Sequence, residues 1–229
     1  MCNDRYFVKS NDRYFMLEFH FHCQKSAFEG GDMRYKAGQK EETRKRIMQA
    51  AGRSFRKNGF SGIGVDGLAK EAGVTSGAFY GHFKSKKEAF EAAVTSGLRE
   101  LGEGVTHFRE QYGDEWWSEF AKFYMQEKRT CDLAESCALQ SLTSEVGRSE
   151  ADIRTLFQTE LLKVVLSAQG NENSIKQGTE RENLDKVWAR LAMLIGGVTL
   201  ARAVADEELA SSIAAAIERT IETHNGRGR

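Results

Sequence analysis

Residues 59–90 have the sequence GFSGIGVDGLAKEAGVTSGAFYGHFKSKKEAF, and this stretch decides the fold. Two short helices are predicted in it, over about 65–72 and 76–83, with Gly73-Val74-Thr75 as a tight turn between them. Glycine supplies the unusual backbone angle that such a turn needs, and a threonine hydroxyl can cap the helix that follows. Two helices joined in this way are typical of a helix-turn-helix, whose second helix enters the major groove of DNA.

Helical periodicity continues on both sides of this stretch. Between Lys40 and Lys57 apolar residues recur every four positions, which predicts an amphipathic helix that ends at Asn58-Gly59. These apolar residues are Ile47, Ala51 and Phe55. After the stretch, Ser85-Lys86-Lys87-Glu88 has the spacing of a capping box and predicts the start of a fourth helix.

The net charge of zero conceals two oppositely charged regions. Residues 34–87 hold 13 Lys and Arg against 4 Asp and Glu, whereas residues 88–229 hold 16 against 24. A basic N-terminal part on an acidic body predicts a polyanionic partner for one end of the molecule. The chain contains no proline, which suits a mostly helical protein because proline interrupts helices.

Residues 40–84 resemble the DNA-binding domain of the tetracycline-repressor (TetR) family. The family's typical run is a helix, G-[FY], a short helix, A-G-V-[ST]-x-G, and then [FY]-x-H-F-x-[ST]-K. The resemblance implies an all-α fold, with a three-helix helix-turn-helix domain over 33–84 and a helical ligand-binding and dimerisation domain over 85–229. It implies a cytoplasmic homodimeric regulator, in most cases a repressor that a small molecule releases from a double-stranded DNA operator.

DNA contacts follow from the same resemblance. The residues at matching motif positions are Thr75, Ser76, Gly77, Tyr80, His82 and Lys86. Arg44 and Arg46, on the basic first helix, are predicted to steer phosphates rather than to read bases. The chain departs from the family at Gly64, where a hydroxyl residue commonly caps the second helix, and at Gly81, where many members carry a larger contact residue.

The acidic body is predicted to contain a mainly apolar cavity for a small-molecule effector. Asp114 is predicted to cap a helix that carries more aromatic residues than one buried face can absorb. Cys131–Arg148 resembles a cysteine-containing helix of one TetR subgroup, with Ser136 in place of its usual glycine. The predicted lining residues are Trp117, Phe120, Tyr124, Cys137, Phe157 and Trp188.

The last two helices are predicted over 184–204 and 209–221. Gly196-Gly197 inside the first of them costs about 1 kcal/mol per residue relative to alanine, which suggests very close packing there. By family resemblance the two helices form a four-helix interface between two copies, while packing within one chain is the alternative. The predicted interface residues are Leu191, Ile195, Gly196, Gly197, Val198, Ile213 and Ile217.

Other functions have weaker support. Cys137 could sense oxidants or electrophiles, although its apolar neighbours Ala138 and Leu139 favour an inert buried thiol. We expect no enzyme, because the sequence lacks a nucleophile–base spacing and a phosphate-binding glycine loop. A dimeric module that has lost DNA binding is a further alternative, and the intact recognition helix argues against it. We predict no cofactor and no metal site.

Residues 1–32 are predicted to be a non-native or disordered extension. They repeat the sequence Asn-Asp-Arg-Tyr-Phe at 3–7 and 11–15 without helical periodicity, and we hypothesise that translation starts at Met33. The alternative is a genuine disordered arm that adds DNA contacts. His20, His22 and Cys23 lack a fourth metal ligand at a suitable spacing. No membrane-spanning or secretory segment is predicted, and four unpaired cysteines suit a reducing cytoplasm.

Overall fold

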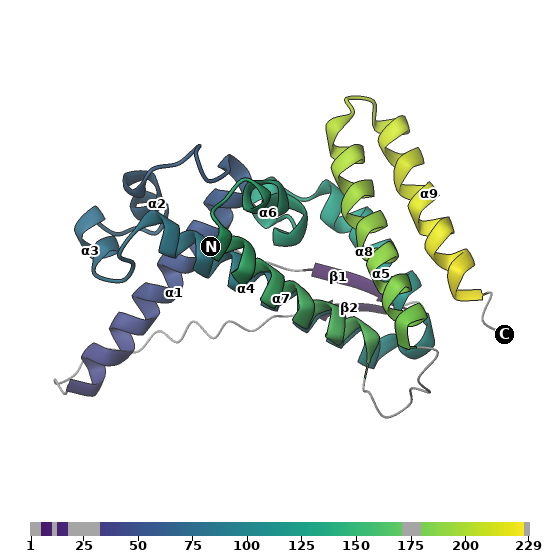
Figure 1. Ribbon diagram of the computed structural model, residues 1–229, viewed down its shortest axis with the longest axis horizontal. Coiled ribbons are helices and arrows are strands. Elements are labelled where there is room, and N and C mark those ends of the chain that lie inside the picture. Colours follow the sequence, from purple (N-terminus) through teal and green to yellow (C-terminus); the bar gives the residue numbers. More distant parts are fainter. Residues whose placement is uncertain (1–5, 11–12, 18–32, 171–179, 227–229) are drawn as a thin grey trace. The chain divides into compact units, whose positions relative to one another are not determined.

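The computed structural model describes residues 6–10, 13–17, 33–170 and 180–226 (Figure 1). The chain divides into two compact units, residues 1–38 and 39–229. The first unit contains the antiparallel strands β1 (Tyr6–Ser10) and β2 (Arg13–Leu17) and the start of helix α1 (Met33–Asn58). The sequence did not predict this hairpin. The metal-ligand candidates at positions 20, 22 and 23 lie outside the described residues.

The described part of the second unit is all helical, as predicted. α1 ends at Asn58, and Gly59 follows with a φ of 72°. Helix α2 (Val65–Glu71) starts without a side-chain cap because Gly64 stands at its N-cap. Gly73 has a φ of 65° and leads into α3 (Ser76–Tyr80). α3 is shorter than predicted, since the chain leaves the helix at Gly81.

A compact apolar core holds these helices together. Phe90 is fully buried, and its ring meets the rings of Phe55 and Phe60 edge-on, at centroid distances of 5.2 and 5.0 Å. Phe79 and Phe83 are also fully buried, so one face of α3 and the turn after it point inward. The core residues of this head (residues 39–90) are Ile47, Ala50, Ala51, Phe55, Leu68, Ala69, Ala72, Phe79, Phe83, Ala89 and Phe90.

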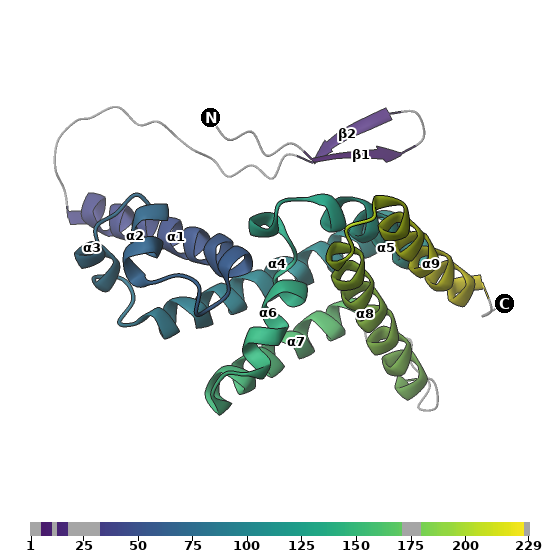
Figure 2. The same cartoon turned by 90° about the horizontal axis from the view of Figure 1, so that it is seen from above.

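Helix α4 (Lys86–Tyr112) begins in the head and continues without a break through the body (Figure 2). The Ser85 hydroxyl caps it by accepting a hydrogen bond from the Glu88 amide at 3.1 Å. The Glu88 carboxylate accepts from the amide of Lys84 at 2.7 Å, one residue before the position that a standard capping box uses. Apolar residues at helical spacing are buried along α4, at Phe90, Val94, Leu98, Val105 and Phe108.

Two local predictions for the body are corrected. Asp114 does not cap the next helix, because it lies inside a 3-10 turn (Gly113–Glu115) that precedes α5 (Trp116–Phe123). A π-helical turn (Tyr124–Lys128) extends α5. Residues 132–136 then form a turn around Leu133–Glu135, in which the Asp132 carboxylate accepts from the Ala134 amide at 2.8 Å. The segment predicted as one helix from Cys131 is therefore helical only in α6 (Ala138–Gly147).

Helix α7 (Ala151–Gln169) packs along α4, and α8 (Glu180–Ala203) packs antiparallel to α9 (Glu207–Gly226) (Figures 1 and 2). The two adjacent glycines of α8 have different surroundings. A Cβ on Gly197 would lie 2.8 Å from Ile217 of α9, whereas a Cβ on Gly196 would meet nothing within 4 Å. The close packing predicted here therefore occurs at Gly197, within one chain.

A second apolar cluster fills the body between α4, α5, α7, α8 and α9. Its main members are Val105, Phe108, Trp116, Trp117, Phe120, Tyr124, Met125, Val165, Val187, Leu191, Leu194, Val198 and Ile221. None of the helices in the described ranges is long and apolar enough to span a membrane.

Candidate nucleic-acid interface

The start of α3 presents small and polar residues on a rigid base. The Thr75 hydroxyl caps the helix by accepting from the Ala78 amide at 3.1 Å, as predicted. The Ser76 hydroxyl donates to the Asp66 carboxylate at 2.5 Å and thereby links α3 to α2. Gly77 is exposed, and a Cβ there would meet only the Thr75 hydroxyl, at 3.9 Å. This end of α3 is low and open, which suits close approach to another molecule.

Tyr80 is the large apolar side chain on the outer face of α3. It is 55% exposed, while its ring rests edge-on against the fully buried Phe79 at a centroid distance of 5.7 Å. His82, two residues later, is half-buried. An aromatic ring held firmly at its base and open to solvent is typical of a contact residue rather than a core residue.

Two of the cations predicted to contact DNA, Arg44 and Lys86, are engaged within the head. The Arg44 guanidinium donates to the backbone carbonyl of His82 and lies 4.3 Å from the centre of the Phe83 ring. The Lys86 ammonium donates to the Ile63 carbonyl at 3.0 Å and lies 4.3 Å from the centre of the Phe60 ring. Arg44 therefore positions the end of α3, and Lys86 positions the loop that precedes α2.

Other cations of α1 are exposed, and Arg46, which was also predicted to steer phosphates, is among them. Lys40, Lys45 and Arg46 face solvent, whereas Arg44 is half-buried. The sequence contains a signal for this, because Arg44 lies three and seven residues before Ile47 and Ala51 and so falls on the same apolar face of the helix. The exposed cations of α1 are the better candidates for phosphate steering.

Replacing Lys86 with methionine separates its two roles. We expect the free energy of unfolding to fall by about 1 kcal/mol, because the Ile63 carbonyl loses its donor and the Phe60 ring loses the ammonium group above it. If the ammonium also binds a phosphate, the slope of log affinity against log salt should fall by about 0.9. Chemical denaturation and DNA titrations at several salt concentrations measure both quantities.

The matched control is Lys84→Met, since Lys84 is exposed and also precedes α4. Its stability should stay within about 0.5 kcal/mol of the wild type. If Lys86→Met is equally stable, the contact to Ile63 has no energetic role. If its salt slope is unchanged, Lys86 only positions the loop.

Most of the residues predicted to line an effector cavity lie in one apolar cluster, where they pack against each other. Trp117, Phe120 and Tyr124 are buried in the second apolar cluster, and Cys137 and Trp188 pack against it. The remaining residue, Phe157, packs against the core that continues from the head. The Trp117 and Phe120 rings lie 6.4 Å apart, and the Phe120 and Tyr124 rings 5.7 Å apart, so aromatic rings occupy the predicted space.

Tyr124 is a polar exception inside this cluster. Its hydroxyl is buried without a nitrogen or oxygen partner in the described part of the chain, and the Cys137 thiol is its polar neighbour. Burial, and to a lesser extent that thiol, raise the pKa of Tyr124 well above its usual value. An unsatisfied buried hydroxyl costs about 1–3 kcal/mol, and a bound polar group could recover this free energy.

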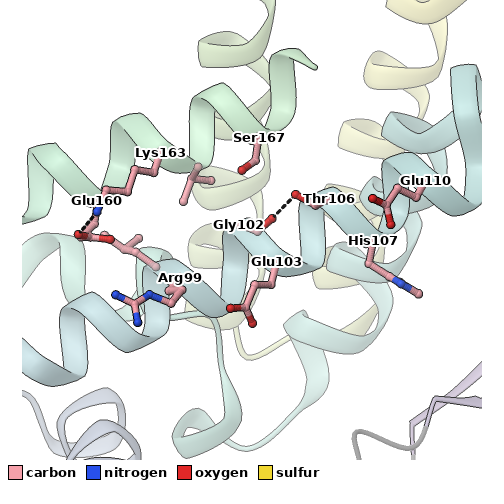
Figure 3. Close-up of a pocket in the computed structure, with 11 residues that line it drawn as sticks. Arg99, Gly102, Glu103, Thr106, His107, Glu110, Glu160, Lys163 and Ser167 are labelled. Carbon is pink, nitrogen blue, oxygen red and sulfur yellow. Dashed lines mark hydrogen bonds and ion pairs between the residues drawn. The ribbon is translucent and has the colours of Figure 1, made fainter. Parts of the chain in front are cut away.

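A cavity of about 350 Å³ lies elsewhere, between α4 and α7 (Figure 3). None of the predicted cavity residues lines it. Its lining residues are Leu98, Arg99, Gly102, Glu103, Thr106, His107, Glu110, Glu160, Lys163, Val164 and Ser167. The sequence analysis missed this polar groove. The available signal was the spacing of Arg99, Glu103, His107 and Glu110, which places ionisable side chains along one side of α4.

The predicted interface residues of the last two helices divide into two groups. Leu191, Gly197 and Val198 are buried inside the protomer and so have little surface left for a second copy. The half-buried members are Ile195, Gly196, Ile213 and Ile217. The outer face of α8 is formed instead by small or apolar residues, among them Ala189, Ala192, Leu200 and Ala203.

The head matches a known family. Residues 47–93 match the family model described as bacterial regulatory proteins, tetR family. The HTH-type transcriptional regulator SrpR of Pseudomonas putida is 45% identical over 60 residues, which cover 26% of this chain and 28% of SrpR. The uncharacterized HTH-type transcriptional regulator YhgD of Bacillus subtilis is 28% identical over 123 residues, which cover 53% of this chain and 60% of YhgD. The matches to both relatives thus span less than two thirds of those proteins.

Solved structures share the fold along most of the chain. The reduced form of NemR from E. coli superposes with a TM-score of 0.63 at 18% identity and covers 78% of this chain and 96% of NemR. A TetR transcriptional regulator from Legionella pneumophila has a TM-score of 0.62 at 14% identity, with coverages of 84% and 99%. From the family-model match and the relatives we conclude that the head of this chain belongs to the tetR family of bacterial regulatory proteins.

Proposed function

We propose that the protein is a dimeric DNA-binding transcriptional regulator, and specifically a repressor that a small-molecule ligand releases from its operator. The observation that carries the proposal is the outer face of α3. There an exposed Tyr80 lies beside the low surface of Ser76 and Gly77, on a head whose core is closed. Such a surface fits the major groove, where small residues allow close approach and a projecting ring can reach base edges or thymine methyl groups.

The test is binding to the DNA that flanks the protein's own gene. We expect Tyr80→Ala to weaken operator binding by about 10- to 100-fold, which corresponds to the loss of one good contact. Fluorescence anisotropy with the labelled flanking duplex measures the affinity, and a scrambled duplex of equal length measures non-specific binding. The wild-type protein should bind the flanking duplex more tightly than the scrambled one and should sediment as a dimer.

Two controls make the result specific. Tyr80→Phe keeps the ring and its contact with Phe79, and should retain most of the affinity if the ring is what touches DNA. Lys84→Met changes an exposed charge outside α3 and should weaken both duplexes alike. Equal affinity of the wild type for the two duplexes, or a monomer at micromolar concentration, would overturn the proposed function.

The dimer contact is proposed on the outer faces of α8 and α9. Leu200 is 61% exposed, and Gly196 leaves open space above α8. Small side chains allow a helix of a second copy to approach closely, and exposed leucine supplies apolar surface to bury. The buried residues Leu191 and Val198 support this face from within rather than contacting the partner.

Ligand release needs contacts that connect the body to the head. The Arg56 guanidinium of α1 donates to the Ala134 carbonyl at 2.7 Å, and Arg53 pairs with Glu135 at 3.1 Å. These contacts join the head to the turn that precedes α6. A ligand that favours one arrangement of the body would act on the head through them, provided that its affinity differs between the two arrangements.

A second connection joins the start of α4 to the start of α7. The Lys87 ammonium lies 2.6 Å from Asp152 and 2.5 Å from Glu150. Hydrogen bonds to Asp152 and then Glu150 raise the pKa of Lys87 above its usual value. Glu150 and Asp152 are exposed and Lys87 is half-buried, so salt should screen this connection.

Sensing through Cys137 has less support. The residue stands at the N-cap of α6 and packs against both apolar clusters, which is the usual environment of a structural cysteine. We therefore retain ligand binding as the proposed signal.

A further inference from the structure

The groove between α4 and α7 has a low apolar floor. Leu98 and Val164 form part of this floor, and Gly102 contributes no side chain to it. A Cβ on Gly102 would lie 3.7 Å from the Ser167 hydroxyl, so the absent side chain helps to keep the groove open. The volume of about 350 Å³ falls in the range of small-molecule sites.

One wall of the groove contains a buried carboxylate. Glu160 of α7 is only 7% exposed, and its carboxylate receives the Lys163 ammonium at 2.6 Å (Figure 3). The Lys163 side chain itself is 61% exposed and flexible. Burying a carboxylate is costly unless it is well paired, so Glu160 would gain from a second cation inside the groove.

The opposite wall, on α4, carries polar groups without partners. Among the described residues Arg99, Glu103 and Glu110 have no ion pair, and the His107 Nε2 atom is buried without a hydrogen bond. Arg99 lies one helical turn before Glu103 and offsets its charge. Over the whole lining three carboxylates face two cations, so the groove has an excess of negative charge.

We propose that this groove binds a short aliphatic diamine or polyamine. One ammonium group would pair with Glu160, a second would lie along the α4 wall near Glu103, and the methylene chain would cover the floor. A neutral His107 side chain can accept a hydrogen bond from such an ammonium group at its Nε2 atom. Val164 lies beside Gly102 and follows Glu160 by one helical turn, so Glu160 and Glu103 are separated by roughly 6–8 Å along the helices, a distance comparable with the length of a six-carbon diamine.

Occupation of the groove would affect the separation of α4 from α7. α4 carries the head at its N-terminal end, and Lys87 connects that end to the start of α7. The expected effect of an occupied groove on DNA binding rests on the regulator function proposed above. The binding of an amine in the groove does not depend on that function. This inference also changes the expected effector from a mainly apolar molecule to a cationic one.

Calorimetric titration of the full chain without DNA tests the binding step. Hexamethylenediamine should bind, while the six-carbon diol and adipate, which have the same chain length, should not. Gly102→Leu fills the floor and should weaken diamine binding by about tenfold or more. The variant should still fold, since leucine is a better helix former than glycine and the added Cβ has room.

Matched controls lie on the same helix. Gly104→Leu makes the same change where an added Cβ meets nothing within 4 Å, and should leave diamine affinity unchanged. Glu103→Gln should weaken diamine binding several-fold, whereas Glu100→Gln, outside the groove, should not. Absent diamine binding, equal binding of adipate, or equal losses in Gly102→Leu and Gly104→Leu would each overturn the proposal.

A separate anisotropy measurement addresses regulation. If the diamine binds as described but leaves operator affinity unchanged, the result supports the amine site and contradicts the ligand-release part of the proposed function. If the protein binds no operator at all, the calorimetric result still decides the amine site on its own.

Discussion

Replacing Phe90 with alanine is expected to lower the free energy of unfolding by about 3–5 kcal/mol. Phe90 is fully buried at the start of α4, and its ring touches both Phe55 of α1 and Phe60 of the loop before α2. The loss of stability has two parts: the hydrophobic free energy of burying one large ring, and the cost of the cavity left between three elements. Because a domain of this size has a total stability of about 5–15 kcal/mol, this single change removes a large part of it.

Urea denaturation followed by circular dichroism measures the effect. Tyr80→Ala is the matched control, since it removes an aromatic ring from the same head at an exposed position and should change stability by less than about 0.5 kcal/mol. A loss below 1 kcal/mol for Phe90→Ala would show that the head does not depend on this three-ring contact.

Gly97→Ala is expected to destabilise the protein by about 1–3 kcal/mol, although glycine to alanine usually stabilises a helix. An added Cβ at Gly97 of α4 would lie 2.2 Å from the Cβ of Ala138, at the start of α6. Neither atom can move without displacing the backbone of its helix. Thermal denaturation should therefore show a lower midpoint, in contrast to Gly104→Ala, which should be neutral or slightly stabilising.

A double-mutant cycle tests whether this contact is the cause. Ala138→Gly removes the opposing methyl group, so the Gly97→Ala/Ala138→Gly variant should recover most of the lost stability. A coupling free energy of about 1 kcal/mol or more would confirm the steric contact. Additive losses would mean that Gly97 matters for another reason.

The head could be predicted from the sequence because its signals are local. Gly59 and Gly73 mark positions where the backbone needs a positive φ, and Thr75 and Ser85 have hydroxyls that cap the helices following them. Each of these signals acts over only a few residues, so spacing alone is enough to recognise it.

The body was harder to predict because its features depend on contacts between distant segments. The groove needs α4 and α7 side by side, and no periodicity in either helix indicates that pairing. The aromatic residues of α5 suggested a cavity, but Phe108 of α4 meets Phe120 and Phe123 at ring distances of 5.3 Å. An aromatic ring of a second helix, α4, thus fills space that the sequence of α5 alone predicted to be a cavity.

Arg44 illustrates a third kind of difficulty. A positive charge on a basic helix was interpreted as a DNA contact, but the guanidinium lies on the Phe83 ring and on a backbone carbonyl. The side chain of arginine combines an apolar stem with a planar cation, so it can pack against a buried ring or lie in solvent. The charge of a residue therefore does not decide which role it has.

The unbroken course of α4 has a mechanical consequence. Its 27 residues form a rod about 40 Å long, so rotating the rod by about 5° at its body end displaces the far end by about 3.5 Å. One base-pair step of duplex DNA is about 3.4 Å along the axis. In the proposed dimer, a rotation of this size would move α3 by a full base step, which is enough to put the two copies of α3 out of register with their half-sites.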